Sequence, residues 1–426
     1  MAQFNKSTHE YLRNNKTLFE VVMLADQQGN SVEGGNPTGT AVDAFGRARQ
    51  SSPLTLFDSF NRYDANDKFS ELFVSGGAVS FNTNTSTVSL EVDGSLGSKV
   101  VRETNRVFAY QPGKSLQIFN TFVMDTHSPG LRQRIGYYND ENGIFIELDD
   151  DGLHFVKRTN ISGTPSDVRV NQSSWSIDPL DGSGPSLNAL DITKAQIFWM
   201  DIEWLGVGSV RCGFVIDGKF IHCHTFNHAN LIDTVYMTTA ILPIRYEIEN
   251  TTVGPPAVLQ QICSTVISEG GYEFRGSGGY ASRGLTKKSV GTTLVPLISI
   301  QLDPTRPDAI AVIQGITATG DAAGAYELVL VKDGTLTNDS FNPAFAGSSV
   351  EFDIAATGIT GGKVLGGTVA EITNQSSLSL DFGGDLFDLQ LERNASTGTT
   401  STYTLAARTD ASSAQMSAAF NWQEVT

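Results

Sequence analysis

Cysteine, positive charge and long apolar runs are all scarce in this chain. Its 426 residues include only three cysteines, Cys212, Cys223 and Cys263, and the net charge is −17. An odd and sparse cysteine count excludes a disulfide framework and is typical of buried thiols in a reducing cytoplasm. The Asn-x-Ser/Thr sequons at Asn84 and Asn160 are therefore not taken as evidence of glycosylation.

The shortage of basic residues narrows the range of partners. Lys287-Lys288 is the densest basic pair, too little for a face that binds nucleic acid or an anionic membrane. No run of 18 apolar residues is present, which excludes a transmembrane helix. The first residues lack the apolar core of a signal peptide, so we expect a protein made in the cytoplasm, with no nucleic-acid partner and no membrane insertion.

The residues that are abundant indicate an all-β protein with a helical arm. There are 42 glycines, and β-forming residues recur at period two, whereas the best helical periodicity is at residues 6–25. We interpret residues 1–45 as an attachment arm made of one amphipathic helix and a polar tether. Such a helix is unstable alone, so the arm needs a partner surface.

Residues 46–275 have the pattern of a two-sheet sandwich. Asn-Gly at 142–143, Asp-Gly at 151–152 and Asp-Gly at 217–218 precede or separate apolar runs, which predicts hairpins with type I′ turns. The run 195–204 is continuously apolar before it alternates, which predicts a central strand. Strands with this regular spacing favour a jelly-roll (concanavalin-like) β-sandwich.

A second, smaller β-sandwich is predicted in residues 291–426. The Gly-Ser-Gly-Gly stretch before it predicts a linker over residues 276–290. Alternating runs then recur at 297–302, 309–316, 326–331, 377–382, 387–391 and 401–406.

One block carries a recognisable sequence. It reads Ala-Gln-Ile-Phe-Trp-Met-Asp-Ile-Glu-Trp at 195–204 and Val-Arg-Cys-Gly-Phe-Val-Ile-Asp-Gly at 210–218. Pieces that fit the same group lie at 46–49, 55–59, 110–114, 134–137, 180–185 and 235–239. Together they resemble structural proteins of tailed phages that infect marine bacteria, including cyanobacteria and Pelagibacter-like hosts. The likeness covers roughly residues 10–275.

The resemblance implies a non-enzymatic virion structural protein, on the tail or another exterior surface. Particle symmetry then implies multiple copies and a homo-oligomer, with the arm docked to other virion proteins. The group supplies no active site, so no catalytic residue and no cofactor is carried over. The alternative is a carbohydrate-binding adhesin that recognises a host surface glycan through a lectin-like site on the jelly roll.

A glycoside hydrolase is a third interpretation. Asp201 and Glu203 lie two apart on the predicted strand and so share a face, and paired carboxylates can cleave glycosides. Jelly-roll glucanases carry Glu-x-Asp-x-Glu on such a strand, but the first position here is Trp199. The nucleophile of that arrangement is missing, so we expect a salt-bridged or solvated face, with Arg211 or Arg245 as partner.

The histidines at 222, 224 and 228 form the only cluster with metal-ligand character. On a regular strand His222 and His224 would share a face, and Cys223 would point away. The spacing matches no zinc finger or HExxH pattern and offers no fourth ligand. We therefore expect no bound metal.

Aromatic residues supply the candidates for a sugar site or a subunit contact. Trp199 is expected in the core, whereas Trp204 lies at the end of its strand and is expected to be exposed. No nucleophile elbow, phosphate loop or dinucleotide fingerprint is present. The candidate sugar-binding or interface residues are Trp204, Tyr137, Tyr138, Asp201 and Glu203.

Overall fold

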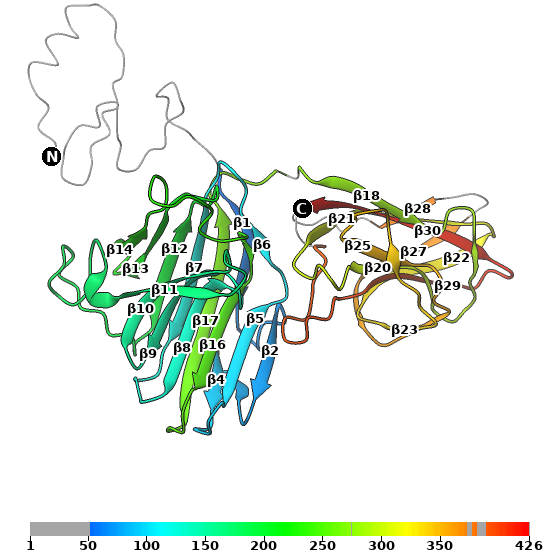
Figure 1. The fold of residues 1–426 in the computed structure, drawn as a ribbon. Helices are drawn as coiled ribbons and strands as arrows, with labels where there is room; N and C mark the ends of the chain where they lie inside the picture. The colour runs from blue at the N-terminus through cyan, green and yellow to red at the C-terminus, as the bar shows by residue number, and fades with distance from the viewer. Residues whose placement is uncertain (1–51, 274, 373–376, 381–388, 426) are drawn as a thin grey trace, which may run out of the picture. The chain divides into compact units, whose positions relative to one another are not determined.

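The computed structural model describes residues 52–273, 275–372, 377–380 and 389–425 (Figure 1). The predicted arm, residues 1–45, lies outside the described residues. The described chain is all-β, as predicted, and its helical content is a single 3₁₀ turn, η1 (Gln172–Ser174). In this part of the chain no helix has the length and hydropathy needed to span a bilayer. From Pro53 onward the described chain forms one compact unit.

The first sandwich has one sheet of eight antiparallel strands. Its spatial order runs β14 (Lys219–Phe226), β13 (Val210–Ile216), β12 (Gln196–Ile202), β7 (Leu116–Val123), β17 (Ala257–Ser268), β4 (Thr87–Val92) and β3 (Ala78–Asn82), with β1 (Leu54–Phe60) paired to β17. The predicted central strand is β12, which lies between β13 and β7. The prediction is therefore confirmed.

The facing sheet has seven antiparallel strands. Its order is β11 (Ser166–Asn171), β10 (Gly152–Thr159), β9 (Gly143–Asp149), β8 (Leu131–Tyr138), β16 (Ile244–Asn250), β5 (Lys99–Thr104) and β2 (Phe69–Val74). A separate two-stranded ribbon pairs β6 (Phe108–Ala109) with β15 (Ile241–Leu242). Late strands return between early ones, since β17 lies between β7 and β4 and β16 between β8 and β5. Long returns of this kind are typical of Greek-key sandwiches.

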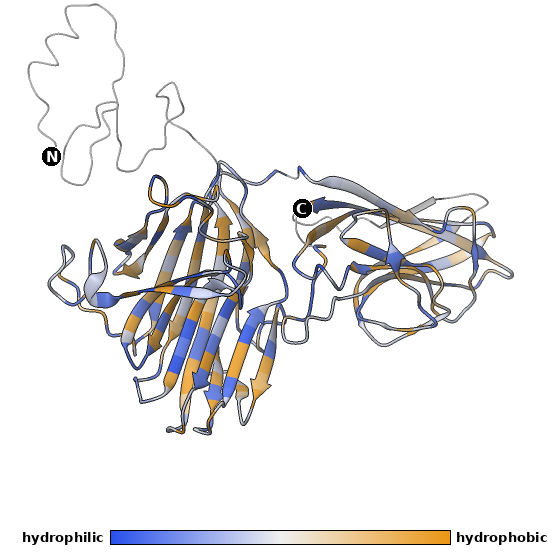
Figure 2. Cartoon of the chain, viewed as in Figure 1, coloured by the Kyte–Doolittle hydropathy of each residue, from blue (hydrophilic) through white to orange (hydrophobic). Residues whose placement is uncertain are grey.

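The core follows from the period-two pattern of the strands, which Figure 2 shows as alternating bands of hydropathy. Phe198 of β12 and Phe214 of β13 point inward, and Phe155 of β10 stacks on Trp175 with ring centroids 4.1 Å apart. Each such ring stabilises the fold by about 2–3 kcal/mol through its burial. Trp199 is buried as expected, but on the outer face of its sheet, where it packs against the exposed Phe220.

The predicted hairpins are present. β13 and β14 are joined by Asp217 and Gly218, whose φ angles of 51° and 72° are those of a type I′ turn. Hairpins also join β8 to β9 and β9 to β10, beside the predicted Asn-Gly and Asp-Gly signals. Neither has the predicted type I′ turn, because Asn142 and Asp151 do not take positive φ angles, and Gly143 and Gly152 are already the first residues of β9 and β10. The local signals therefore located all three hairpins, but they gave the right turn type only between β13 and β14.

The second sandwich also consists of two antiparallel sheets. The first is ordered β18 (Ser277–Ser282), β30 (Gln415–Val425), β21 (Ile310–Gly320) and β28 (Ser377–Leu380), with β19 (Lys288–Ser289) paired to β30. The second is ordered β24 (Asn342–Pro343), β25 (Val350–Asp353), β20 (Val295–Leu302), β29 (Tyr403–Thr409), β22 (Gly324–Lys332) and β27 (Lys363–Ile372). A further pair is β23 (Thr335–Thr337) and β26 (Gly358–Thr360).

The linker predicted at 276–290 is wrong. That segment contributes β18 and β19, which pair with β30 inside the second sandwich. Its glycines serve close packing, because the indole of Trp422 lies directly over Gly279 and leaves no room for a side chain. Sequence alone cannot distinguish a glycine that gives flexibility from one that admits a neighbouring ring.

We predict that Gly279→Ala destabilises the protein, because the added Cβ would collide with the Trp422 indole. Overpacking of this kind costs about 1–3 kcal/mol, seen as a lower melting temperature. Gly278→Ala is the matched control, because no heavy atom lies within 4 Å of the position of its Cβ. Equal effects of the two substitutions would restore the linker interpretation.

Candidate functional site

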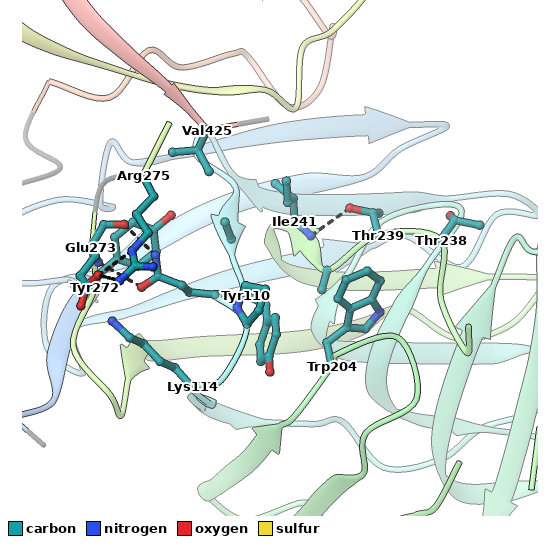
Figure 3. A pocket seen from close by; sticks show the side chains of 14 residues that line it. Tyr110, Lys114, Trp204, Thr238, Thr239, Ile241, Tyr272, Glu273, Arg275 and Val425 are labelled. Carbon is teal, nitrogen blue, oxygen red and sulfur yellow. Dashed lines mark hydrogen bonds and ion pairs between the residues drawn. The ribbon is translucent and has the colours of Figure 1, made fainter. Parts of the chain in front are cut away.

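A pocket of about 590 Å³ opens beside the β6–β15 ribbon of the first sandwich (Figure 3). Its walls come from the turn that follows β6, from Trp204 just beyond β12, from residues 238–241 and from the chain that follows β17. Val425 of β30 completes the lining. The pocket gathers segments far apart in the sequence around one of the predicted residues, Trp204.

Two aromatic rings form one wall of the pocket. Tyr110 and Trp204 meet edge to face, with centroids 6.3 Å apart and an interplanar angle of 70°. The hydroxyl of Tyr110 and the indole nitrogen of Trp204 are both shielded from solvent. Tyr110 is itself buried and Trp204 is half-buried, so only part of each ring reaches the pocket. Because the polar atoms are covered, that part is carbon.

The loop between β12 and β13 holds Trp204 in place. The Gly208 N–H donates to the Trp204 carbonyl at 2.7 Å, and the Tyr236 N–H donates to the Gly206 carbonyl at 2.9 Å. Leu205 and Gly206 take positive φ angles of 37° and 77°, which turn the chain sharply after the tryptophan. The loop is thus tied both to itself and to the neighbouring loop at residue 236.

The β6–β15 ribbon forms the floor of the pocket, and Tyr137 of β8 contacts it from the interior of the sandwich. The Tyr137 hydroxyl lies 2.5 Å from the Phe108 carbonyl and 2.7 Å from the Ala240 carbonyl. It also accepts a hydrogen bond from the Leu242 N–H at 3.2 Å. Above it, the Tyr110 N–H donates to the same Ala240 carbonyl at 3.0 Å. Tyr137 therefore positions the pocket without lining it.

The rim of the pocket carries the charged side chains. The Lys114 N–H donates to the Gln111 carbonyl at 3.1 Å across a Pro-Gly turn in which Gly113 has a φ of 84°. The Gln111 side chain bonds both the N–H and the carbonyl of Glu273. A hydrogen bond from Arg275, at 2.7 Å, lowers the pKa of the Glu273 carboxyl. These contacts bring two cations and one anion to the mouth.

The other predicted aromatic residues lie inside the protein. Tyr137 and Tyr138 are fully buried, and burial raises the pKa of both phenols. Tyr138 packs on Phe145, with centroids 4.4 Å apart, and beneath the Arg245 guanidinium at 5.3 Å from its ring. Trp204 is thus the predicted aromatic that reaches the pocket, although it is half-buried against the core rather than exposed as expected.

The two predicted carboxylates have separate surroundings. Asp201 is buried and ion-paired with Arg211, its cross-strand partner on β13, as the salt-bridge interpretation predicted. Burial raises the pKa of Asp201 to about 6, and Arg211 offsets only part of that rise. Glu203 lies beyond the end of β12, is exposed, and has the Ser209 hydroxyl 3.5 Å away.

The histidine cluster does not assemble into a metal site. Cys223 lies in the core, and His228 donates to the Gly208 carbonyl at 2.6 Å. Burial lowers the pKa of both His224 and His228 to about 4. A register shift between β13 and β14 breaks the expected alternation around His222. Among the described residues no three His, Cys, Asp or Glu side chains converge in a way that could hold a metal ion.

Several residues of the pocket were not foreseen from the sequence. Tyr110, Lys114, Thr238 and Thr239 all line it. The Pro-Gly turn before Lys114 is a local signal, but nothing in the sequence brings that turn to Trp204. The pairing of β6 with β15 does so.

No protein-family model matches the sequence, and no curated protein matches it. Among solved structures, the chain is similar to a β-glucanase of Bacillus licheniformis (12% identity, 49% of this chain and 96% of that chain, TM-score 0.31). It is also similar to arcelin-5, a lectin-like defence protein of Phaseolus vulgaris (8%, 51% and 99%, 0.31). A third similar structure is a carbohydrate esterase of the Shiga toxin-encoding bacteriophage phi24B (12%, 51% and 100%, 0.31). Likeness at this level assigns neither function nor site residues to this chain.

We predict that Asp201→Asn stabilises the protein at pH 8. The folded state holds the Asp201 proton more tightly than the unfolded chain, since its pKa of about 6 lies above the ordinary 3.8. The ionised carboxylate therefore weakens the fold above pH 6, by about 1–3 kcal/mol, and this cost disappears as the pH falls towards 4.

Thermal melts from pH 4 to pH 8 measure this effect. The advantage of Asp201→Asn should grow with pH, whereas the control Asp233→Asn removes the same charge from an exposed loop and should not show that trend. A variant less stable than the parent at pH 8 would contradict the prediction and show that the Arg211 ion pair outweighs burial.

Proposed function

We propose that the protein binds a glycan in the pocket beside Trp204. The observation that supports this most is the wall formed by Trp204 and Tyr110, whose polar atoms are covered while the ring carbons face the pocket. Such a wall suits the apolar C–H face of a sugar ring. The remaining lining supplies a small set of polar groups for orientation, as ligand sites generally do.

The size of the pocket suits a short stretch of polysaccharide. A volume of about 590 Å³ lies within the range of small-molecule sites, roughly 300–1,000 Å³. Most of the lining lies on segments that connect strands, where a rigid sandwich commonly carries binding residues, and the β6–β15 ribbon forms the floor.

We further propose that this binding serves a phage particle. The support is the resemblance of residues 10–275 to structural proteins of tailed phages of marine bacteria. In that setting the protein is an exterior component, present in several copies, and the pocket contacts the host surface. Mass spectrometry of purified particles tests this assignment, since a virion protein stays with the particles through a density gradient and a free protein does not.

The proposed role is non-enzymatic. Asp201 is ion-paired with Arg211, Glu203 is exposed beyond the strand, and Trp199 occupies the position of the missing nucleophile. A retaining or inverting glycosidase needs two carboxyl groups that face one cleft. We therefore expect a bound oligosaccharide to be recovered intact after prolonged incubation.

We predict that Trp204→Ala lowers glycan affinity at least about thirtyfold, because it removes half of the aromatic wall. Binding to an array of bacterial surface glycans, followed by calorimetry on the hits, measures the loss. Trp204→Phe should retain part of the affinity. Tyr280→Ala, which removes an exposed ring from β18, is the control and should bind like the parent.

The test has two informative failures. If no bacterial glycan binds the parent protein, the pocket is not a glycan site. If glycans bind equally well to the parent and to a folded Trp204→Ala variant, binding occurs elsewhere on the protein and the site assignment is wrong.

A further inference from the structure

We infer that the pocket selects sugars that carry a carboxylate, such as uronic acids. This inference rests on the proposed glycan function and adds the chemical class of the ligand. The basis is the set of hydrogen-bond donors and acceptors in the pocket lining that no protein group already uses.

Lys114 is the charged group at the rim that the described residues leave without an ion-pair partner. Of the three charged lining residues, Glu273 and Arg275 form an exposed ion pair, whereas Lys114 makes no ion pair with a described residue and only adds to the lowering of the Glu273 pKa. Lys114 is half-buried, and its stem packs over Gly270, where a Cβ would lie 2.6 Å from the lysine Cγ. The backbone turn and this packing limit where the ammonium group can go. Because no described residue pairs with the ammonium group, its three N–H donors remain available to a ligand.

Two hydroxyls on another part of the lining are also donors. Thr238 accepts a hydrogen bond from the Asn142 side chain at 2.8 Å, and Thr239 accepts one from the Ile241 N–H at 3.0 Å. Each hydroxyl has one hydrogen, and within the described residues neither hydrogen is donated to a protein acceptor. Figure 3 shows Lys114 on one side of the two rings and these threonines on the other.

The acceptors of the lining are largely committed. Gln111 uses both ends of its amide on the backbone of Glu273, and the Glu273 carboxylate is engaged by Arg275. The pocket therefore offers an excess of donors and one unpaired positive charge. A ligand rich in acceptors and negatively charged complements it best, and charge-assisted hydrogen bonds are the strong ones.

Paired oligosaccharides that differ only in charge test the inference on the full-length protein. Oligosaccharides of polygalacturonate, alginate and hyaluronan are each compared with their carboxyl-reduced, neutral counterparts by calorimetry. We expect the acidic member of a bound pair to bind about tenfold more tightly, as a hydrogen bond to a charged group implies. Lys114→Ala should remove that difference, and Lys114→Arg should keep most of it.

The control is Lys219→Ala, which removes an exposed lysine from the start of β14 and should leave the preference unchanged. Equal affinity for the acidic and reduced members, lost in Trp204→Ala, would overturn the acidic preference and leave the glycan function standing. Acidic binding that survives Trp204→Ala would mean attraction to charge outside the pocket and would overturn both. Absence of binding to every member would also count against both.

Discussion

The hydroxyl of Tyr137 ties the interior of the first sandwich to the ribbon above it. It lies within 2.7 Å of carbonyl oxygens from both segments, Phe108 and Ala240, and accepts from the Leu242 N–H. Leaving such buried backbone groups without partners would cost about 1–3 kcal/mol each. The ribbon in turn places Tyr110 at the pocket wall. A fully buried side chain of β8 thus determines where the pocket lies.

The outer face of the seven-stranded sheet, to which β8 belongs, carries pairs of opposite charges. Arg134 of β8 lies between its register neighbours Glu147 of β9 and Glu247 of β16. Burial alone would raise the pKa of Glu247, but the surrounding cations, Arg245 foremost, hold it far below its usual range. Paired charges can occupy a buried face because each finds a partner across the strands, whereas removing one partner would leave an uncompensated charge.

These features explain which parts of the molecule could be predicted from its sequence. Local signals sufficed for the all-β class, for the hairpin at Asp217-Gly218 and for the central strand that leads to Trp204. The predicted linker failed because Gly279 is needed for the Trp422 ring, a contact made by the far end of the chain. Likewise, no periodicity in the sequence pairs β6 with β15, on which the pocket depends.

Alternation also misleads about exposure when the polar face of a strand is itself buried. Residues 244–250 alternate apolar and charged, which ordinarily indicates one face in water, yet Arg245 and Glu247 are both buried. Tyr138 is covered by the same band, under Arg245. A surface role for Tyr138 was therefore a reasonable expectation from sequence, and only the cross-strand register shows why that ring is enclosed.

The net charge of the whole chain affects how the pocket rim could bind an acidic sugar. At −17 the protein repels an approaching anionic polysaccharide, but at physiological ionic strength this repulsion is screened beyond about 8 Å. Lys114 acts at hydrogen-bond distance, inside that screening length and on a half-buried stem. Discrimination in favour of a carboxylate would therefore arise from contact rather than from steering, and would show mainly in the dissociation rate. An acidic chain with a locally cationic rim would avoid general adhesion to polyanions and still allow the proposed contact with an acidic sugar.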